Sequence, residues 1–231
     1  MKSIHAIRSF VRLASLVCLP VLALPVLRGE AAAGLSPESS LQRLLDGNQR
    51  FVAGRAEHPH QGEQRRLELT KGQTPFAVVL TCADSRVAPE LFFDQGLGDL
   101  FVLRNAGNLV DEHILGSIEY AVEHLHAPLV VVVGHEKCGA VGAALAGGHA
   151  PGHIGSLVEC IEPAIEAAKD QPGDRADNTT RAHAKLMVAE ILKKSAIVAE
   201  AVEAGHLKVL AARYDLDTGA VELHRARVQI V

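Results

Sequence analysis

Short, continuous runs of apolar residues recur along the chain and predict buried strands. They occupy residues 76–81, 100–104, 128–134 and 207–212. A run of this length without polar alternation is typical of a strand covered on both faces, as in a parallel sheet. Aromatic residues are few, with no Trp and 2 Tyr, so we expect aliphatic side chains to fill the core.

Between these runs, apolar residues recur at helical spacing. Cap-type residues from Ser36 onward precede a stripe of leucines, which predicts an N-terminal helix. The stripe consists of Leu41, Leu44 and Leu45. Similar patterns predict helices over 112–124, 154–169 and 181–204.

Polar segments predict the connections. Residues 56–72 form a polar stretch before the first strand, and we expect residues 170–180 to be a surface loop. The segment 220–228 follows the turn signal Asp217-Thr-Gly and alternates, which is typical of an edge strand. The whole pattern predicts an α/β fold, with a mainly parallel central sheet of four strands plus an antiparallel edge strand, flanked by helices.

The first 33 residues differ from the rest. Basic residues precede an apolar run over 13–27, and three alanines end at Ala33. This is typical of a secretory signal peptide, because the run is shorter than the ~20 residues that a spanning helix needs. We expect cleavage after Ala33, export to a bacterial periplasm without stable membrane insertion, and one domain over 34–231. An uncleaved anchor and lipidation at Cys18 are the alternatives.

The charge balance is mildly acidic, with 23 Lys and Arg against 27 Asp and Glu. Because the sequence contains no cluster of Lys and Arg that could bind a phosphate backbone, nucleic acid is not an expected partner. Loss of the leader with Cys18 leaves an odd number of cysteines in an oxidising compartment. One disulfide with one free thiol satisfies this count, and so do two metal-bound thiolates with one buried thiol.

Cysteine follows two of the predicted strands at the point where each ends. Cys82 follows the first run, and His135 and Cys138 follow the third. Ligands of parallel sheets bind beyond the carboxyl ends of the strands, so we expect these side chains to meet. Two thiolates and an imidazole suit one zinc ion per subunit and leave a fourth position for water, as in catalytic sites. A predicted helix after Cys138 favours its thiolate.

Asp84 and Arg86 follow Cys82 at spacings that point their side chains the same way in an extended segment. The carboxylate would accept a hydrogen bond from hydroxide on the metal, and the arginine would hold the carboxylate. An ordinary surface salt bridge, which stabilises little, is the alternative.

The two segments together resemble the signature of the β-class carbonic anhydrases. The signature residues are Cys82-Ala-Asp84-Ser-Arg86 and His135-x-x-Cys138-Gly139. Further similarity runs in the expected order from about Leu41 to the C-terminus, at Gly72-Gln73, Phe101, Arg104-Asn-Ala-Gly-Asn, Ser117-Ile-Glu-Tyr120 and Tyr214-Asp-Leu-Asp-Thr-Gly. The resemblance implies reversible hydration of carbon dioxide to bicarbonate and a proton by zinc-bound hydroxide, with Cys82, His135 and Cys138 as the zinc ligands.

The resemblance also implies the roles of neighbouring residues. Asp84 and Arg86 become the dyad that orients hydroxide. The substrate-binding residues are expected to be Gln73, Val79, Phe101, Ala106, Tyr120 and Gly139. Apolar side chains in this set suit a nonpolar substrate, and Gln73 and the Gly139 N–H would hold its oxygens.

The resemblance also bears on the subtype and the assembly. Family members regulated by bicarbonate carry Trp three residues before the first cysteine, where this chain has Val79. We therefore expect the open, plant-like site, and a pH-driven closure of Asp84 onto the metal is the alternative. A homodimer or homotetramer is also expected, with the predicted N-terminal helix as a packing arm.

Three other functions compete with this interpretation. A hydrolase of carbonyl sulfide or carbon disulfide would use the same zinc hydroxide. A non-catalytic zinc or bicarbonate-binding protein is expected to lack Asp84 or Arg86, and both are present. A dinucleotide-binding enzyme that uses Gly139-x-x-Gly142 is disfavoured, because no G-x-G-x-x-G motif follows any predicted strand.

Overall fold

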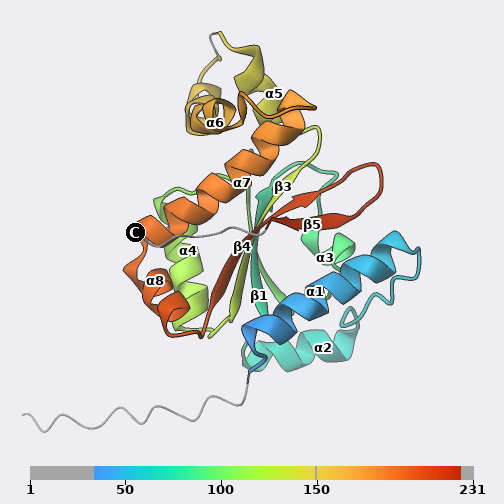
Figure 1. Cartoon of the computed structure of the whole chain (residues 1–231). Coiled ribbons are helices and arrows are strands. Elements are labelled where there is room, and N and C mark those ends of the chain that lie inside the picture. The colour runs from blue at the N-terminus through green and yellow to red at the C-terminus, as the bar shows by residue number, and fades with distance from the viewer. Residues whose placement is uncertain (1–33, 149, 225–231) are drawn as a thin grey trace, which may run out of the picture. The chain divides into compact units, whose positions relative to one another are not determined.

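A five-stranded sheet forms the centre of the computed structural model, which describes residues 34–148 and 150–224 (Figure 1). The strands are β1 (Ala77–Cys82), β2 (Leu100–Asn105), β3 (Leu129–His135), β4 (Lys208–Tyr214) and β5 (Val221–His224). Their order is β2-β1-β3-β4-β5. The first four strands pair in parallel and β5 pairs antiparallel with β4, which confirms the predicted fold class.

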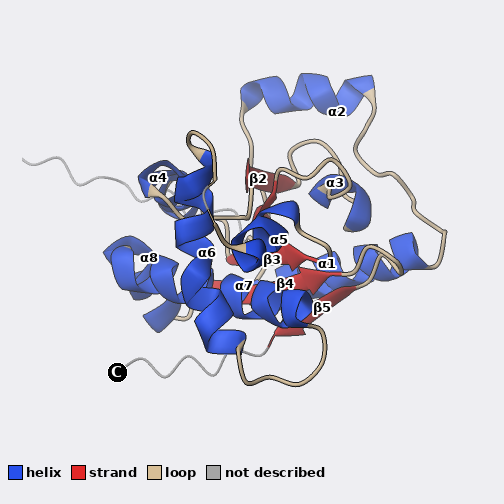
Figure 2. Ribbon diagram, turned by 90° about the horizontal axis from the view of Figure 1, so that it is seen from above, coloured by secondary structure: helices blue, strands red, loops and turns tan. Residues whose placement is uncertain are grey.

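Helices cover both faces of the sheet and the carboxyl ends of its strands (Figure 2). They are α1 (Pro37–Val52), α2 (Glu63–Glu68), α3 (Pro89–Phe92), α4 (Glu112–Glu123), α5 (Gly139–Ala146), α6 (Ile154–Ala168), α7 (Arg175–Lys194) and α8 (Ala196–Glu203), with a 3₁₀ turn, η1 (Leu69–Lys71). Helices α4, α7 and α8 pack on one face, and α1 and α3 pack on the other. No helix in the described ranges has the length and apolar character needed to cross a membrane.

Strands β1 and β3 are buried along their whole length, which explains their continuous apolar sequences. Because successive side chains of a strand point to opposite faces, each strand contributes to two cores. Val78 and Leu80 pack with residues of α4, α7 and α8. Val79 packs with Leu44 of α1 and Phe92 of α3.

Helix α1 belongs to the core of its own chain. Its Asn48 side chain donates to the carbonyls of Phe92, at 2.9 Å, and Gly219, at 2.8 Å. The Asn48 side-chain oxygen also accepts from the Val221 N–H at 2.9 Å. The three hydrogen bonds of this buried amide therefore join α1 to α3 and to the start of β5.

Two of the predicted boundaries differ from the structure. The surface loop predicted over 170–180 is wrong from Arg175 onward, because Asp174 caps α7 by accepting from the Asp177 N–H at 2.7 Å. The long helical segment 181–204 contains a break at Ser195, whose side chain caps α8. Polar residues in the first turns of α7 concealed its true start.

Other predictions are only partly covered by the structure. The polar stretch 56–72 contains α2 and η1. The predicted edge strand is β5 as far as His224, and its residues 225–228 lie outside the described residues. The predicted signal peptide, residues 1–33, also lies outside them.

We predict that Gly47→Ala destabilises the protein by about 1–3 kcal/mol. A Cβ at Gly47 would lie 1.8 Å from the Phe93 carbonyl oxygen, so α1 must move away from α3. Urea unfolding measures the loss. Gly116→Ala in α4 is the matched control, since a Cβ there meets nothing within 4 Å, and it should be neutral or stabilise by up to about 1 kcal/mol. Equal stabilities for the two variants would contradict the close contact.

Candidate metal centre

The strand order reverses direction between β1 and β3. At the carboxyl ends of these strands the chain leaves β1 toward β2 on one side and leaves β3 toward β4 on the other, so the two connections diverge. Such a switch point is where open α/β sheets bind their ligands. Cys82 ends β1 and His135 ends β3.

The structure brings Cys82, His135 and Cys138 together at this point. Their ligand atoms all lie within 4.8 Å of one another, and all three residues are buried. A tight turn follows His135, in which Lys137 has a positive φ of 53°, and Cys138 then occupies the N-cap position of α5. The turn allows one strand exit to supply two of the three candidate ligands.

The hydrogen bonding of His135 leaves one ring nitrogen for a metal. Its Nδ1–H donates to the Glu136 carbonyl at 2.8 Å, which fixes the tautomer. The other nitrogen, Nε2, is buried and has no hydrogen-bond partner. Buried polar atoms are rarely left unpaired, so this atom fits a ligand to a metal between it and the two sulfurs.

The two cysteines shift each other's pKa in opposite directions. A hydrogen bond from Cys138 lowers the pKa of Cys82 to about 4, and the Gly107 N–H supports its thiolate at 3.3 Å. The hydrogen bond to Cys82 raises the pKa of Cys138, which outweighs the backbone N–H groups at the start of α5. These N–H groups do lower the pKa of Cys138, in the direction that its sequence position predicted. A divalent cation between the two sulfurs would stabilise both thiolates.

Asp84 and Arg86 form a close ion pair beside the cluster. Arg86 Nε donates to Asp84 Oδ1 at 2.9 Å, and Nη2 donates to Oδ2 at 2.7 Å. This bidentate contact holds the pKa of Asp84 well below its usual range. Asp84 Oδ2 lies 3.9 Å from His135 Nε2, so the carboxylate is adjacent to the candidate metal position. Arg86 also donates to the Lys137 carbonyl at 3.2 Å, which joins the two strand exits.

Arg104 and Gly107 hold the cluster from the neighbouring strand, β2, and the turn after it. Arg104 donates to the carbonyls of Cys82, at 3.0 Å, and Asp84, at 2.8 Å. Gly107 supplies the N–H that points at the Cys82 sulfur. The family resemblance includes this segment but assigned these two residues no role, because nothing in the sequence shows which carbonyls Arg104 reaches.

Two of the expected substrate-binding residues lie at the cluster. Ala106 is exposed in the turn after β2, next to Gly107, and Gly139 is exposed at the first position of α5, next to Cys138. Val79 does not lie there. It is fully buried on the opposite face of β1 from Cys82 and therefore belongs to the core, not to a wall of the site.

Gln73, Phe101 and Tyr120 lie away from the metal cluster of their own chain. Gln73 precedes β1, and Cys82 is the last residue of that strand. Because six strand residues span roughly 17 Å, Gln73 lies near the amino-terminal ends of the strands, away from Cys82. Phe101 of β2 lies beside Val78 of β1, and Val78 precedes Cys82 by four residues along that strand. The Phe101 and Tyr120 rings are 6.4 Å apart.

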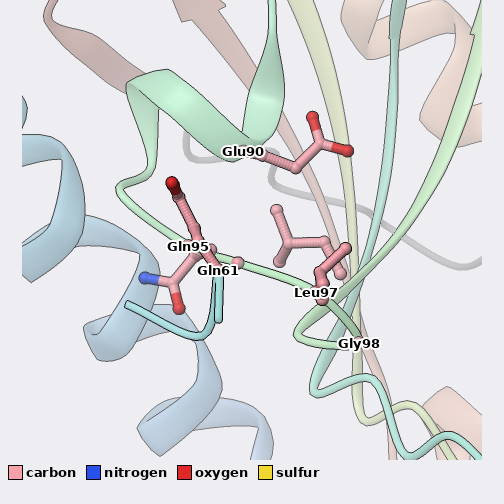
Figure 3. Close-up of a pocket in the computed structure, with 7 residues that line it drawn as sticks. Gln61, Glu90, Gln95, Leu97 and Gly98 are labelled. Carbon is pink, nitrogen blue, oxygen red and sulfur yellow. The ribbon is translucent and has the colours of Figure 1, made fainter. Parts of the chain in front are cut away.

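Two hollows adjoin at the same amino-terminal edge of the sheet. One, of about 350 Å³, lies between α3 and the loop before β2, and its lining includes Gln61, Glu90, Gln95, Leu97 and Gly98 (Figure 3). The other, also of about 350 Å³, contains Gln73 and shares Leu97 and Gly98 with the first. Neither hollow is lined by a residue of the metal cluster.

The three cysteines in the described part of the chain are free of disulfide bonds. Cys82 and Cys138 are buried at the cluster, whereas Cys160 is exposed on α6. Two metal-bound thiolates beside one buried thiol was one of the two arrangements that the cysteine count allowed. The third thiol, Cys160, is not buried as that arrangement required, because its position on α6 faces solvent.

Comparison with known proteins gives a consistent family. The family model for carbonic anhydrase matches residues 77–221. Carbonic anhydrase 2 of Mycobacterium tuberculosis is 44% identical over 192 residues, which cover 81% of this chain and 93% of the relative. The carbonic anhydrase of Mycolicibacterium smegmatis is 45% identical over the same shares of the two chains. The crystal structure of the β-carbonic anhydrase CafA of Aspergillus fumigatus is 30% identical, with a TM-score of 0.62 over 80% of this chain and 90% of that one.

The fold, the cluster at its switch point and these similarities define a carbonic anhydrase of the β class, and the chain belongs to that family. It is an enzyme, as the curated relatives of nearly equal length are carbonic anhydrases.

We predict that Cys138→Ser abolishes tight zinc binding, because the cluster loses a thiolate and keeps only two of its three donors. Metal analysis after dialysis should give about one zinc ion per chain for the unchanged protein and almost none for the variant. Cys160→Ser is the matched control and should retain zinc, since Cys160 is exposed on α6 and outside the cluster. Zinc retention by Cys138→Ser would remove Cys138 from the site.

Proposed function

We propose that this chain is a zinc enzyme that interconverts carbon dioxide and bicarbonate at the Cys82, His135 and Cys138 cluster. The observation that carries the proposal is the buried, unpartnered Nε2 of His135 beside two buried cysteine sulfurs, with the three ligand atoms within 4.8 Å of one another. Three protein donors are the number that a catalytic zinc site uses, with one position left for water. Zinc held there would act as a Lewis acid that brings the pKa of water toward neutrality.

Asp84 supplies the group that orients the attacking water or hydroxide. As a carboxylate it can only accept hydrogen bonds, so it selects the orientation in which the oxygen lone pair points at carbon dioxide. Both of its oxygens already accept from Arg86, which fixes the carboxylate plane and keeps it ionised. Arg86 thus acts through Asp84.

The surroundings of the cluster suit a small nonpolar substrate. Leu109, Val141 and Ile161 pack around the two cysteines in one apolar group. Carbon dioxide lacks charge and a dipole, so an apolar wall admits it at little cost, while exposed Ala106 and Gly139 leave the approach free of bulky side chains.

The open form of the site is the form that we propose for this enzyme. The bidentate contact with Arg86 holds both Asp84 oxygens, and the ligand group consists of Cys82, His135 and Cys138 without Asp84. Movement of Asp84 onto the metal would break both contacts with Arg86. The Val79 position, where bicarbonate-regulated relatives carry Trp, supports the same form.

We further propose that the enzyme works as a homodimer or homotetramer in which a second copy completes the substrate pocket. Gln73, Phe101 and Tyr120 lie toward the other end of the sheet from Cys82 in their own chain, so they can line a pocket only beside a neighbouring copy's metal. Tyr120 is 49% exposed, which leaves its ring available for such a contact.

The leader supports a proposal about location. A basic start, an apolar run interrupted by proline and the alanines before Gly34 favour export to the periplasm of a bacterium and removal of residues 1–33. Mass spectrometry of the secreted protein should give an N-terminus at Gly34. A protein that keeps Met1 and sediments with membranes would contradict cleavage.

Stopped-flow assays on zinc-loaded protein test the reaction. Carbon dioxide hydration should be fast, and parallel assays with carbonyl sulfide and carbon disulfide should show little turnover. Hydrolysis of a sulfur compound without carbon dioxide hydration would contradict the proposal, because the same metal chemistry would then serve a different substrate.

We predict that Asp84→Asn keeps zinc but loses about 10- to 100-fold of the carbon dioxide turnover. Asparagine has nearly the same shape, but its NH₂ donates where the carboxylate accepts. Stopped-flow hydration together with zinc analysis measures both effects. Asp217→Asn is the matched control, since Asp217 pairs with Lys137 on the surface and should retain full turnover. Unchanged turnover of Asp84→Asn would refute the role of Asp84.

A further inference from the structure

His183 is a buried histidine that the proposed chemistry does not use. It lies on α7 and is 1% exposed. Its Nε2 contacts the Gly107 carbonyl oxygen at 2.8 Å, and its Nδ1 is buried without a partner. Since a carbonyl oxygen can only accept, Nε2 must carry the proton. Burial lowers the pKa of His183, so the ring stays neutral and keeps this single donor.

Gly107 connects His183 to the metal cluster. The Gly107 carbonyl accepts from His183, and the Gly107 N–H donates to Cys82 Sγ at 3.3 Å. Hydrogen bonds to a ligand atom orient it and stabilise its charged form. The position of the Gly107 backbone therefore decides whether its N–H points at the Cys82 sulfur.

Other hydrogen bonds hold the turn that contains Gly107 but do not engage the Gly107 carbonyl. The Asn105 side chain binds the Leu109 N–H at 2.7 Å and the Leu109 carbonyl at 2.9 Å, and the Asn108 N–H donates to the Asn105 carbonyl at 3.2 Å. Gly107 has a positive φ of 83°, and a Cβ there would lie 3.3 Å from both Ala140 of α5 and Ile161 of α6. These apolar contacts restrict the position of the turn. His183 holds the carbonyl end of the peptide group between Gly107 and Asn108, and the Asn108 N–H holds its other end through the Asn105 carbonyl.

The position of His183 is itself fixed by close packing. Helix α7 lies so near β3 that a Cβ on Gly134 would be 2.9 Å from the Thr180 side chain. His183 follows Thr180 by one helical turn and lies on the same side of the helix. Gly134 precedes the metal-cluster residue His135 in β3, so α7 and the cluster rest on the same strand.

We infer that His183 is a positioning residue for the metal centre, which holds Gly107 so that its N–H donates to the Cys82 thiolate. The inference rests on the proposed zinc site. It assigns His183 no contact with substrate or metal. Loss of the His183 donor should free the Gly107 carbonyl, weaken the N–H···S bond and make Cys82 a poorer, less well oriented ligand.

The test compares His183→Leu with His183→Gln. Leucine removes the donor, whereas the glutamine amide can still donate to the Gly107 carbonyl. Chelator competition should show zinc affinity about 10-fold weaker or more for His183→Leu and near that of the unchanged protein for His183→Gln. His224→Leu is the matched control, because His224 is also a buried histidine with an unpartnered nitrogen and lies on β5.

The cobalt-substituted proteins give a readout that a simple packing defect would not produce. Loss of a hydrogen bond to the thiolate makes its electrons easier to transfer, so the sulfur-to-cobalt absorption band should shift to lower energy in His183→Leu. The band should return in His183→Gln and stay unchanged in His224→Leu. Equal affinity and an equal spectrum for His183→Leu and the unchanged protein would overturn the inference.

Nitrogen NMR on the unchanged protein keeps the inference testable if a variant does not fold. It should find the His183 ring neutral, with its proton on Nε2. A proton on Nδ1 alone would overturn the inference, because Nε2 and the Gly107 carbonyl would then both be acceptors. Failure of the proposed function would look different, since the unchanged protein would bind no zinc while the ring could still show the Nε2–H tautomer.

Discussion

Parallel pairing of β1 with β3 is the constraint on which the metal centre depends. The register aligns Val78 with Val130 and Thr81 with Val133, so both strands end at the same edge of the sheet. Cys82 and His135 meet there although they lie far apart in the sequence. The turn at Lys137 then adds Cys138 from the same exit. A shift in this register would separate the sulfur on β1 from the other two donors.

The layers around the sheet supply what the donors need. Helix α5 begins at the cluster, and its apolar side chains, with those of α6, exclude water from the sulfurs. The turn after β2 contributes an N–H to Cys82, and Arg104 holds the carbonyls of Cys82 and Asp84. These contacts mean that the donors are oriented before a metal arrives, as a site for fast chemistry requires.

Much of this arrangement was predictable from local pattern. Continuous apolar runs identified the strands, because both faces of β1 and β3 are covered, and strand ends then identified the three donors. The position of Val79 was also predictable, since a strand alternates its side chains and Val79 is an odd number of residues from Cys82.

The remaining features depend on contacts distant in sequence. The first turns of α7 contain polar residues that are typical of loops, and their burial against β3 follows only from the packed fold. His183 reaches Gly107 across 76 positions of the sequence. No spacing rule connects these two residues, so the support that α7 gives to the cluster became visible only in three dimensions.

Our proposal that Cys82, His135 and Cys138 hold a zinc ion can be tested by X-ray absorption at the zinc edge of the purified protein. We expect two sulfur neighbours at about 2.3 Å and one imidazole nitrogen at about 2.0 Å, with one further light atom in the fourth position. A spectrum with only oxygen and nitrogen neighbours, or with four sulfurs, would contradict it.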